Sequence, residues 1–507
     1  MEQRAFDQSD VFAFLADPAT HGLSEPVKRI DTHGAAVFLA GKDVYKVKKA
    51  VRFPFMDFST LDKRQHACAR ELAVNQANAP DLYLGTVPIS REDSKLRLGS
   101  GGTIIEWAVH MRRFDENQTL DRLAERHELN SEIMARLACA VAASHRCAPT
   151  MLGANSSGAL EAQIEETLVS LEAAQDIFAT QTAAWLRQAM QQAFNQGKPL
   201  LREREDQGHV RRCHGDLHLR NIVLIEGRPV LFDAIEFNEA FATCDVLYDL
   251  AFLLMDLWTR GLHRHANLLF NRYLWTSDDV ETQLKGLTLI PLFLSARAAI
   301  RAKVIVLEPG GAKDHATEAR HYFEAAREFL VPRRRDLVAI GGLSGSGKSS
   351  LAVALAGSIG GAPGAMHLRS DIERKRLFNV SEFDRLPEAA YQPEITERTY
   401  RRLRDLAAIA LNAGQSVIVD AVHLRPEERV AIEQVASQNK AHFMGLWLEV
   451  PVDQLIQRVE KRKADASDAT AGVVSAQAQQ KAGAMDWHRV DASAPIEDIA
   501  SGILATL

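Results

Sequence analysis

The sequence lacks several features that would place it in a special class at once. Its five cysteines are scattered and form no CxxC pair, which excludes a disulfide framework or zinc ribbon and predicts reduced thiols in the cytoplasm. No apolar run approaches about 18 residues, and the first residues lack the apolar core of a signal peptide, so no membrane segment is expected. A net charge of −6 without a track of basic and aromatic residues argues against a nucleic-acid partner.

A chain of 507 residues is too long for one ordinary hydrophobic core, so we expect two or three domains. Within residues 20–115, two β-rich runs joined at "AGKD" and further strand-like runs predict a β-rich lobe with one main helix at 59–78. Residues 116–330 have mainly helical spacing. After a linker at 331–336, residues 337–507 alternate strands and helices, which is typical of a doubly wound parallel sheet, with strands expected at 337–341, 364–369, 416–420 and 442–449.

The strongest motif is "GGLSGSGKSS", which follows an apolar strand and precedes a helix. It fits G-x-x-x-x-G-K-[ST], a loop whose backbone N–H groups and following helix terminus approach phosphate oxygens. The lysine of such a loop contacts the β- and γ-phosphates, and its serine binds Mg²⁺. The predicted ATP-binding residues here are Gly342, Leu343, Ser344, Gly345, Ser346, Gly347, Lys348, Ser349 and Ser350.

Two carboxylates and two arginines are expected to complete the site around this phosphate loop. Asp371, in "LRSDIERKR", is expected either to accept the proton of an acceptor hydroxyl or to cap a helix. Asp420 ends the strand "SVIVD" and is expected to bind Mg²⁺ or to contact substrate. Arg458 and Arg462 lie four apart in "LIQRVEKRK", where they would clamp phosphates from a lid or form a solvated basic face.

Residues 337–507 therefore resemble small P-loop kinases of the gluconate kinase, shikimate kinase and polynucleotide kinase type. The resemblance rests on the phosphate loop, the "SD" at residues 370–371 followed by "RK", the strand-end Asp420 and the arginine-bearing helix. It implies phosphoryl transfer from ATP, with Mg²⁺, to a small hydroxyl compound. The polar segment 463–483 that follows is predicted to be mobile.

Another candidate phosphoryl-transfer site lies in "RRCHGDLHLRNIVL" and in the "VLFDAIEF" that follows it. Asp216 is expected to take or orient the proton of an acceptor hydroxyl, while Asn221 and Asp233 hold the Mg²⁺ that bridges ATP phosphates. The hairpin "NIVLIEGRPVLFD" should bring Asn221 and Asp233 together, since they flank its two strands.

A lysine and a helix acid should complete this set. "DVYKVKK" supplies Lys46 and, two residues on and therefore on the same strand face, Lys48. "CARELAVN" supplies Glu71 on the first main helix, placed to hold a lysine against the α- and β-phosphates. Both lysines are candidates for the ATP lysine, and Lys46 fits the pattern of the family named below better than Lys48.

Residues 20–330 resemble the aminoglycoside phosphotransferase family, which has a protein-kinase-like fold. The family's "HGDxxxxN" is present from His214 to Asn221, and its later metal-binding aspartate matches Asp233. The resemblance implies an ATP site between two lobes, a hinge near 111–114, a packing role for His214, and two buried structural acids, Asp245 and Asp249. The chain departs from the protein-kinase pattern in two places: it lacks a GxGxxG loop before Lys46, and it has "DAIEF" where protein kinases have "DFG". Glu236 of this segment would assist the metal or cap the loop. His218 is expected to face either the substrate or the solvent.

The combination resembles a bacterial fusion of an aminoglycoside-phosphotransferase-like domain (1–330, lobes 20–115 and 116–330) with a P-loop kinase domain (337–507). The expected fold class is a kinase-like α+β bilobal domain followed by an α/β P-loop domain. The favoured function is a kinase with two sites acting on a sugar, a sugar acid or a phosphorylated acceptor. An aminoglycoside acceptor is less favoured, because the residues around Asp216 are basic, namely Arg211, Arg212, His218 and Arg220. The alternatives are a regulatory ATPase in which one domain gates the other, and a polynucleotide 5′-kinase.

Overall fold

The structure, a computed structural model, describes residues 7–53, 56–277, 279–307, 313–382, 384–461, 466–480 and 482–506. The chain forms two compact units, Met1–Gln163 with Leu201–Leu253, and Ile164–Leu200 with Leu254–Leu507. Three helices begin in one unit and end in the other, namely α5 (Ser156–Ala173), α6 (Thr180–Asp206) and α8 (Val246–Thr259). The domain limits expected from the sequence stay a prediction.

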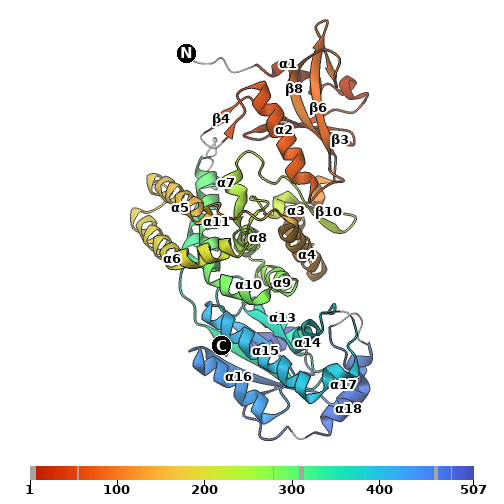
Figure 1. The fold of residues 1–507 in the computed structure, drawn as a ribbon, viewed down its shortest axis with the longest axis vertical. Coiled ribbons are helices and arrows are strands. Elements are labelled where there is room, and N and C mark those ends of the chain that lie inside the picture. Colours follow the sequence, from red (N-terminus) through yellow and green to blue (C-terminus); the bar gives the residue numbers. More distant parts are fainter. Residues whose placement is uncertain are drawn as a thin grey trace. The chain divides into compact units, whose positions relative to one another are not determined.

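The first unit opens with the β-rich lobe that the β-rich runs and the hairpin signal predict. Its antiparallel sheet has the order β1-β2-β3-β8-β6-β7, with apolar residues such as Val44 and Val109 buried under helix α2. The turn at "GK" joins β2 to β3, as the hairpin signal indicated. The elements of this lobe are α1 (Ser9–Ala16), β1 (Lys28–Asp31), β2 (Ala35–Ala40), β3 (Asp43–Lys48), β4 (Arg52–Phe53), β5 (Met56–Asp57), α2 (Leu61–Gln76), β6 (Tyr83–Glu92), β7 (Lys95–Leu98) and β8 (Thr103–Arg112) (Figure 1).

The rest of the first unit is built from short strands and helices. The predicted hairpin is present as β10 paired with β11, in the register Ile222 with Leu231, and β9 pairs with β12. This part therefore presents the "HGDLHLRN" loop between β9 and β10. The elements are α3 (Leu120–Glu125), α4 (Ser131–Cys147), β9 (Val210–Arg212), β10 (Ile222–Ile225), β11 (Arg228–Leu231), α7 (Glu239–Ala242) and β12 (Thr243–Asp245).

The second unit combines helices with a five-stranded parallel sheet of order β14-β15-β13-β16-β17. Helices α13 and α19 pack into one core with the sheet, and α15 and α16 pack against each other (Figure 1). The strands are β13 (Asp336–Gly342), β14 (Met366–Arg369), β15 (Val417–Asp420), β16 (His442–Glu449) and β17 (His488–Asp491). The helices are α9 (His263–Trp275), α10 (Val280–Gly286), α11 (Ile290–Leu307), α12 (Lys313–Glu328), α13 (Lys348–Ala356), α14 (Ser370–Leu377), α15 (Pro393–Asn412), α16 (Pro426–Gln438), α17 (Val452–Lys461), α18 (Ala471–Ala478) and α19 (Ile496–Leu504).

The parallel sheet confirms the doubly wound fold class. The four expected strands are all present, and β17 is a fifth strand that the sequence pattern did not reveal. Because parallel strands end at the same edge, the phosphate loop after β13, Asp371 after β14 and Asp420 of β15 lie at one edge of the sheet. Within the described residues every helix is too short or too polar to cross a membrane.

Candidate active sites

The half-buried Lys46 and the buried Lys48 share one glutamate in the first unit. Strand β3 places Lys46 and Lys48 on the same face, and helix α2 carries the fully buried Glu71 toward them. Lys46 Nζ lies 2.8 Å from Glu71 Oε1, and Lys48 Nζ lies 2.5 Å from Glu71 Oε2. Each carboxylate oxygen of Glu71 therefore holds one lysine.

The two lysines differ in their second partners. Lys46 Nζ lies 2.5 Å from Oδ1 of Asp233, the predicted metal ligand, whereas Lys48 forms an ion pair with Glu236. The ammonium of Lys48 also lies 5.4 Å from the centre of the Phe58 ring. This arrangement favours Lys46 as the ATP lysine and gives Glu236 a partner other than a metal ion, although the assignment of each role stays a prediction.

The charge state of this cluster is set by its burial and its pairing. Burial alone would raise the pKa of Glu71, but Lys46 and Lys48 outweigh that effect and lower it to about 2. Burial would likewise lower the pKa of Lys46, and the charges of Asp233 and Glu71 instead hold it well above its usual value. Both lysines and Glu71 are thus ionised at neutral pH.

Asp233 is held in an uncommon backbone conformation. Its φ is +62°, a left-handed value that costs a non-glycine residue about 1 kcal/mol or more. Its backbone N–H donates to the Tyr83 hydroxyl at 3.1 Å, and the next N–H, of Ala234, donates to Asn75 Oδ1 at 2.8 Å. These bonds from β6 and α2 stabilise the bend that turns the Asp233 carboxylate toward Lys46.

The "HGDLHLRN" loop brings the predicted base and metal amide together. Asn221 Nδ2 donates to Asp216 Oδ2 at 3.0 Å and to the Asp216 carbonyl at 3.0 Å. His218 Nε2 lies 3.3 Å from Asp216 Oδ2 and its ring meets Phe252 edge-on, so His218 faces the aspartate and not the solvent. The Phe232 N–H donates to the Asn221 carbonyl at 3.0 Å, which brings Asn221 beside Asp233 as the hairpin predicted.

Two buried acids, Asp245 and Asp249, stabilise the segment around the "HGDLHLRN" loop. Asp249, fully buried, accepts hydrogen bonds from the backbone N–H of Gly215 at 2.8 Å and of His214 at 3.3 Å. Asp245 forms a bidentate pair with the buried Arg204, at 2.6 Å and 2.9 Å. Burial lowers the pKa of His214, whose Nε2 donates to the Phe232 carbonyl at 2.9 Å. His214, Asp245 and Asp249 are therefore buried and bonded within the fold, and their purely structural role stays a prediction.

The basic residues near Asp216 have partners within the fold. Arg211 donates to the carbonyls of Arg146 and Ala148, at 2.8 Å and 3.0 Å. Arg212 donates to the carbonyls of Cys213 and Ile235 and lies 3.3 Å from Glu239. Arg220 lies 3.6 Å from Asp121. The basic sequence pattern therefore reflects internal contacts as well as surface charge.

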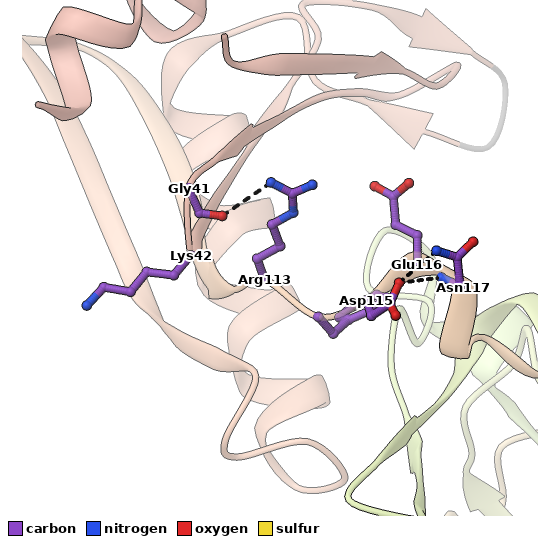
Figure 2. A pocket seen from close by; sticks show the side chains of 7 residues that line it. Gly41, Lys42, Arg113, Asp115, Glu116 and Asn117 are labelled. Carbon is purple, nitrogen blue, oxygen red and sulfur yellow. Dashed lines mark hydrogen bonds between the residues drawn. The ribbon is translucent and has the colours of Figure 1, made fainter. Parts of the chain in front are cut away.

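A pocket of about 450 Å³ opens beside the expected hinge (Figure 2). The Arg113 N–H donates to the Lys42 carbonyl at 2.9 Å, and its guanidinium donates to the Gly41 carbonyl at 3.3 Å. These bonds connect the hinge segment to the β2–β3 turn. The lining residues are Gly41, Lys42, Arg113, Phe114, Asp115, Glu116 and Asn117, none of which is a predicted site residue.

The site around the phosphate loop lies at the edge of the parallel sheet. Gly347 has a φ of +93°, and helix α13 begins directly after it at Lys348. Lys348 Nζ donates to the carbonyls of Gly342 and Leu343, at 2.9 Å and 3.0 Å, so the side chain curls over its own loop. A Cβ at Gly342 would lie 2.9 Å from the Leu448 carbonyl, which explains why the loop needs glycine there.

The predicted metal acid and serine of this site are in contact. Ser349 Oγ donates to Asp420 Oδ2 at 2.5 Å, and the buried His367 of β14 places Nε2 3.4 Å from the same oxygen. Burial would raise the pKa of Asp420, but His367, Arg369 and Lys348 keep it below its usual value. Asp420 is therefore an ionised oxygen donor beside the phosphate loop.

Asp371 lies in the first turn of α14, where Arg369 is the N-cap. Its side chain does not cap the helix and instead bonds with Ser467. Burial raises the pKa of Asp371, with Arg369 opposing the rise. A half-buried carboxylate with a raised pKa is a better proton acceptor than a solvated one, which favours the base over the cap.

Basic side chains of α14 and α17 have partners within the fold. Buried Arg374 donates to the Ala390 carbonyl at 2.7 Å, and buried Lys375 lies 3.3 Å from Asp468. Arg458 donates to the Ala492 carbonyl at 3.0 Å, so its role as a phosphate clamp stays a prediction. Arg462 lies outside the described residues.

The segment expected to be mobile contains helix α18, which packs on the phosphate loop. Val474 of α18 packs with Leu455 and Val459 of α17 and with Leu343, and Gln477 Oε1 accepts the Ser344 N–H at 2.9 Å. Asp468 accepts hydrogen bonds from the Leu386 N–H and the Tyr391 hydroxyl, at 3.0 Å and 2.9 Å. These contacts come from distant parts of the chain, and no local motif announced them.

Two histidines near Asp420 were also missed. His367 lies within the predicted strand "MHLR", and His423 follows Asp420 by three residues. A histidine within or just after an apolar strand was the signal that could have marked both residues. His423 is 1% exposed, and neither ring nitrogen has a hydrogen-bond partner among the described residues. Its ring meets Tyr400 and Trp487 edge-on, and burial lowers its pKa to about 3.

Both sites offer the ligands that Mg²⁺ prefers. Asp233 and Asn221 supply a carboxylate and an amide oxygen, and Ser349 and Asp420 supply a hydroxyl and a carboxylate within hydrogen-bond distance of each other. Hard oxygen donors suit Mg²⁺, which binds one or two protein groups beside phosphates and water. The residues present therefore fit the ion.

Known proteins match both halves of the chain. A model of the family described as "Phosphotransferase enzyme family" matches residues 42–280, and an "AAA domain" model matches residues 337–483. Uncharacterized proteins of Mycobacterium tuberculosis and Mycobacterium bovis are each 29% identical over 483 residues, covering 92% of this chain and 92% of their own. The structure of a choline/ethanolamine kinase family protein from Mesorhizobium loti aligns with 64% of this chain and 94% of its own, with 16% identity and a TM-score of 0.38. A gluconokinase from Sinorhizobium meliloti aligns with 34% of this chain and 92% of its own, with 21% identity and a TM-score of 0.25.

Proposed function

We propose that this chain, whose residues 42–280 match the phosphotransferase enzyme family and whose residues 337–483 match an AAA domain, is a kinase with two phosphoryl-transfer sites. The two matches and the phosphate loop support ATP-dependent phosphoryl transfer. The proposal adds that both sites are active and that each acts on a small hydroxyl-bearing acceptor.

The observation that carries the proposal is the position of Lys46 between Glu71 and Asp233, at 2.8 Å and 2.5 Å. This lysine would contact the ATP phosphates while Asp233 and Asn221 hold Mg²⁺, which neutralises phosphate charge. Asp216 would accept the proton of the acceptor hydroxyl. The acceptor oxygen then bonds to the γ-phosphorus, the bond to the β–γ bridging oxygen breaks, and ADP leaves.

In the second site the same tasks fall to different residues. Lys348 would leave the carbonyls of Gly342 and Leu343 for the β- and γ-phosphates, and the loop N–H groups would cradle them. Ser349 and Asp420 would hold Mg²⁺. Asp371, whose pKa is raised by burial, would accept the acceptor proton.

The acceptor at each site is proposed to be a sugar-like polyol. The arginines around Asp216 donate to backbone carbonyls or pair with acids, so they no longer favour an anionic acceptor over a neutral one. Arg374 and Lys375 of the second site are buried in contacts of their own. Sugar acids and aminoglycosides remain in the set of acceptors to be tested.

The test is ³¹P NMR of ATP·Mg²⁺ turnover with pooled sugars, sugar acids and aminoglycosides. Wild type is compared with Asp216→Asn, Lys348→Ala and the exposed control Asp62→Asn. We expect two phosphoester signals, one lost in Asp216→Asn and the other in Lys348→Ala, with both kept in the control.

Other outcomes identify the alternatives. Free phosphate as the sole product in every sample would overturn the proposal in favour of a regulatory ATPase. Phosphorylation of an added oligonucleotide, with no sugar product, would point to a polynucleotide 5′-kinase. Loss of both signals in either single variant would show that the two sites do not work independently.

A further inference from the structure

Helix α9 packs along the outer edge of the parallel sheet, beside strand β14. Among the described residues, strand β14 is the outermost strand of the sheet, and its one neighbouring strand is β15. Three side chains of α9, Asn267, Asn271 and Trp275, are spaced four residues apart and therefore lie on one helix face. This face meets the open edge of β14.

The contact follows the backbone of β14 group by group. Asn267 Nδ2 donates to the carbonyls of Pro363 and Ala365, both at 3.0 Å. Asn271 Oδ1 accepts the His367 N–H at 2.7 Å, and its Nδ2 donates to the Ala365 carbonyl at 3.1 Å. One helical turn rises about 5.4 Å and two strand residues about 6.6 Å, so the helix side chains match alternate groups of the strand.

Trp275 continues this row and touches the side chains of β14 as well. Its Nε1 donates to the His367 carbonyl at 3.0 Å, and its ring meets the His367 ring edge-on at 5.7 Å. The Arg369 guanidinium lies 5.9 Å from the centre of the same indole. Trp275 thus contacts both β14 side chains that approach Asp420.

From β14 the contacts reach the phosphate loop directly. His367 Nε2 lies 3.4 Å from Asp420 Oδ2, and Arg369 Nε lies 3.8 Å from it. The same oxygen accepts the Ser349 hydroxyl at 2.5 Å. Trp275 therefore reaches Asp420 through one intervening residue, His367 or Arg369, and Asp420 contacts Ser349 of the loop directly.

We propose that Trp275 and Asn271 are positioning residues for the Mg²⁺ ligands of the P-loop site. They hold His367 and Arg369 against Asp420, which in turn orients Ser349. Helix α9 lies within the residues that match the phosphotransferase family, so that region supplies part of the support for the P-loop site. This inference rests on the proposed Mg²⁺ and ATP site of the second unit and deepens it.

The test follows binding, not turnover. Hydrogen exchange is measured on the phosphate-loop peptide, residues 342–350, in the full chain with a non-hydrolysable ATP analogue and increasing Mg²⁺. Trp275→Phe keeps an aromatic ring and removes the N–H donor. The matched control is Trp185→Phe, because Trp185 lies on α6, is 39% exposed and contacts none of these residues.

We expect Trp275→Phe to raise the Mg²⁺ concentration for half-protection about three- to tenfold, the size expected for one lost hydrogen bond. Asn271→Ala, which frees the His367 N–H, should shift the midpoint in the same direction. Trp185→Phe should match wild type. Exchange in β14 should quicken in the two α9 variants before Mg²⁺ is added.

The outcomes separate this inference from the proposed function. Equal midpoints for Trp275→Phe and Trp185→Phe would overturn the positioning role and leave the site intact. No protection of the loop in wild type would overturn the proposed site and the role of Trp275 with it. If Asn271→Ala fails to fold, the comparison of the two tryptophan variants decides alone.

Discussion

The two candidate sites hold their lysines in opposite ways. In the first unit, Lys46 is fixed between two carboxylates, Glu71 and Asp233, that lie 25 and 187 residues away in the sequence. In the second unit, Lys348 rests on two carbonyls of its own loop, five and six residues away. The first site therefore depends on tertiary packing, while the second is largely a local backbone structure completed by Asp420.

This difference explains which substitutions should be costly for folding. A lysine buried among acids cannot be removed without leaving a charge unpaired, whereas a lysine lying on its own loop can be removed with little effect on the fold. The first site should thus show coupled losses of stability and turnover, and the second should show losses of turnover alone.

The largest expected effect compares Lys46→Met with Lys48→Met. Lys46→Met should lower kcat at the first site by about 10²–10³-fold, because it removes the cation that holds the α- and β-phosphates of ATP. Lys48→Met should mainly lower the free energy of unfolding, by about 3–5 kcal/mol, because Glu71 and Glu236 lose their shared partner. Steady-state kinetics and urea unfolding measure the two quantities, with turnover at the second site as an internal control.

The opposite pattern, with turnover lost only in Lys48→Met, would reverse the assignment of the ATP lysine. Equal losses in the two variants would mean that both ammonium groups meet the nucleotide.

The free energy of unfolding at low pH should reveal the contribution of Glu71 and its two lysines. The pKa of Glu71 is about 2 in the folded chain and 4.5 ordinarily, so its contribution is complete above about pH 4.5 and lost as the pH falls toward 2. The full contribution is about 3 kcal/mol. Urea unfolding between pH 6 and 2 should show this loss in wild type and in the exposed control Glu132→Gln, and a smaller slope in Glu71→Gln.

His423 should make the second unit sensitive at a higher pH. Its pKa is about 3 in the folded chain and 6.5 ordinarily, so the unfolded chain takes up a proton as the pH falls below about 6.5, and stability decreases. At pH 5 the loss is about 2 kcal/mol. Hydrogen exchange of residues 417–424 should quicken between pH 7 and 5, after correction for intrinsic rates, and His423→Phe should abolish most of that change.

A pH response that survives unchanged in His423→Phe would assign it to other groups, such as His367, whose pKa burial also lowers.

The smallest expected effect concerns the local contact that helix α18 makes with the phosphate loop. Gln477→Ala removes the acceptor for the Ser344 N–H and should weaken the docking of α18 by about 1 kcal/mol. Exchange in residues 471–480 should quicken about fivefold, consistent with that energy. The exposed neighbour Gln479→Ala serves as the control, and equal exchange in both variants would show that the hydrogen bond does not hold the helix.

The sequence predicted the parts of both sites that depend on fixed spacing. The phosphate loop follows from the length of its motif, and the meeting of Asn221 with Asp233 follows from a two-strand hairpin. The pairing of Glu71 with the β3 lysines was expected instead as part of the set of residues that a kinase-type site uses. The four strands of the parallel sheet were predicted close to their observed limits, because each is an apolar run with glycine or polar residues at its ends.

The missed features depend on contacts between residues far apart in the sequence. Nothing local distinguishes Lys46 from Lys48, because they share a strand face and differ only in which distant acid each one meets. Arg374 and Lys375 lie in a charged run that gives no sign of burial, yet both are buried beside carbonyls and Asp468 of other segments. The docking of α9 on β14 was likewise invisible, since asparagines on a helix carry no sign of the strand they will meet.

The covered edge of β14 has a consequence for dissecting this protein. A fragment that starts at the linker, near residue 331, would keep the whole parallel sheet but lose Asn267, Asn271 and Trp275. Its outer strand would then present unpaired N–H and C=O groups, which are a template for pairing with another chain. Such a fragment would tend to associate or precipitate, whereas one that begins before His263 would carry its own protective helix.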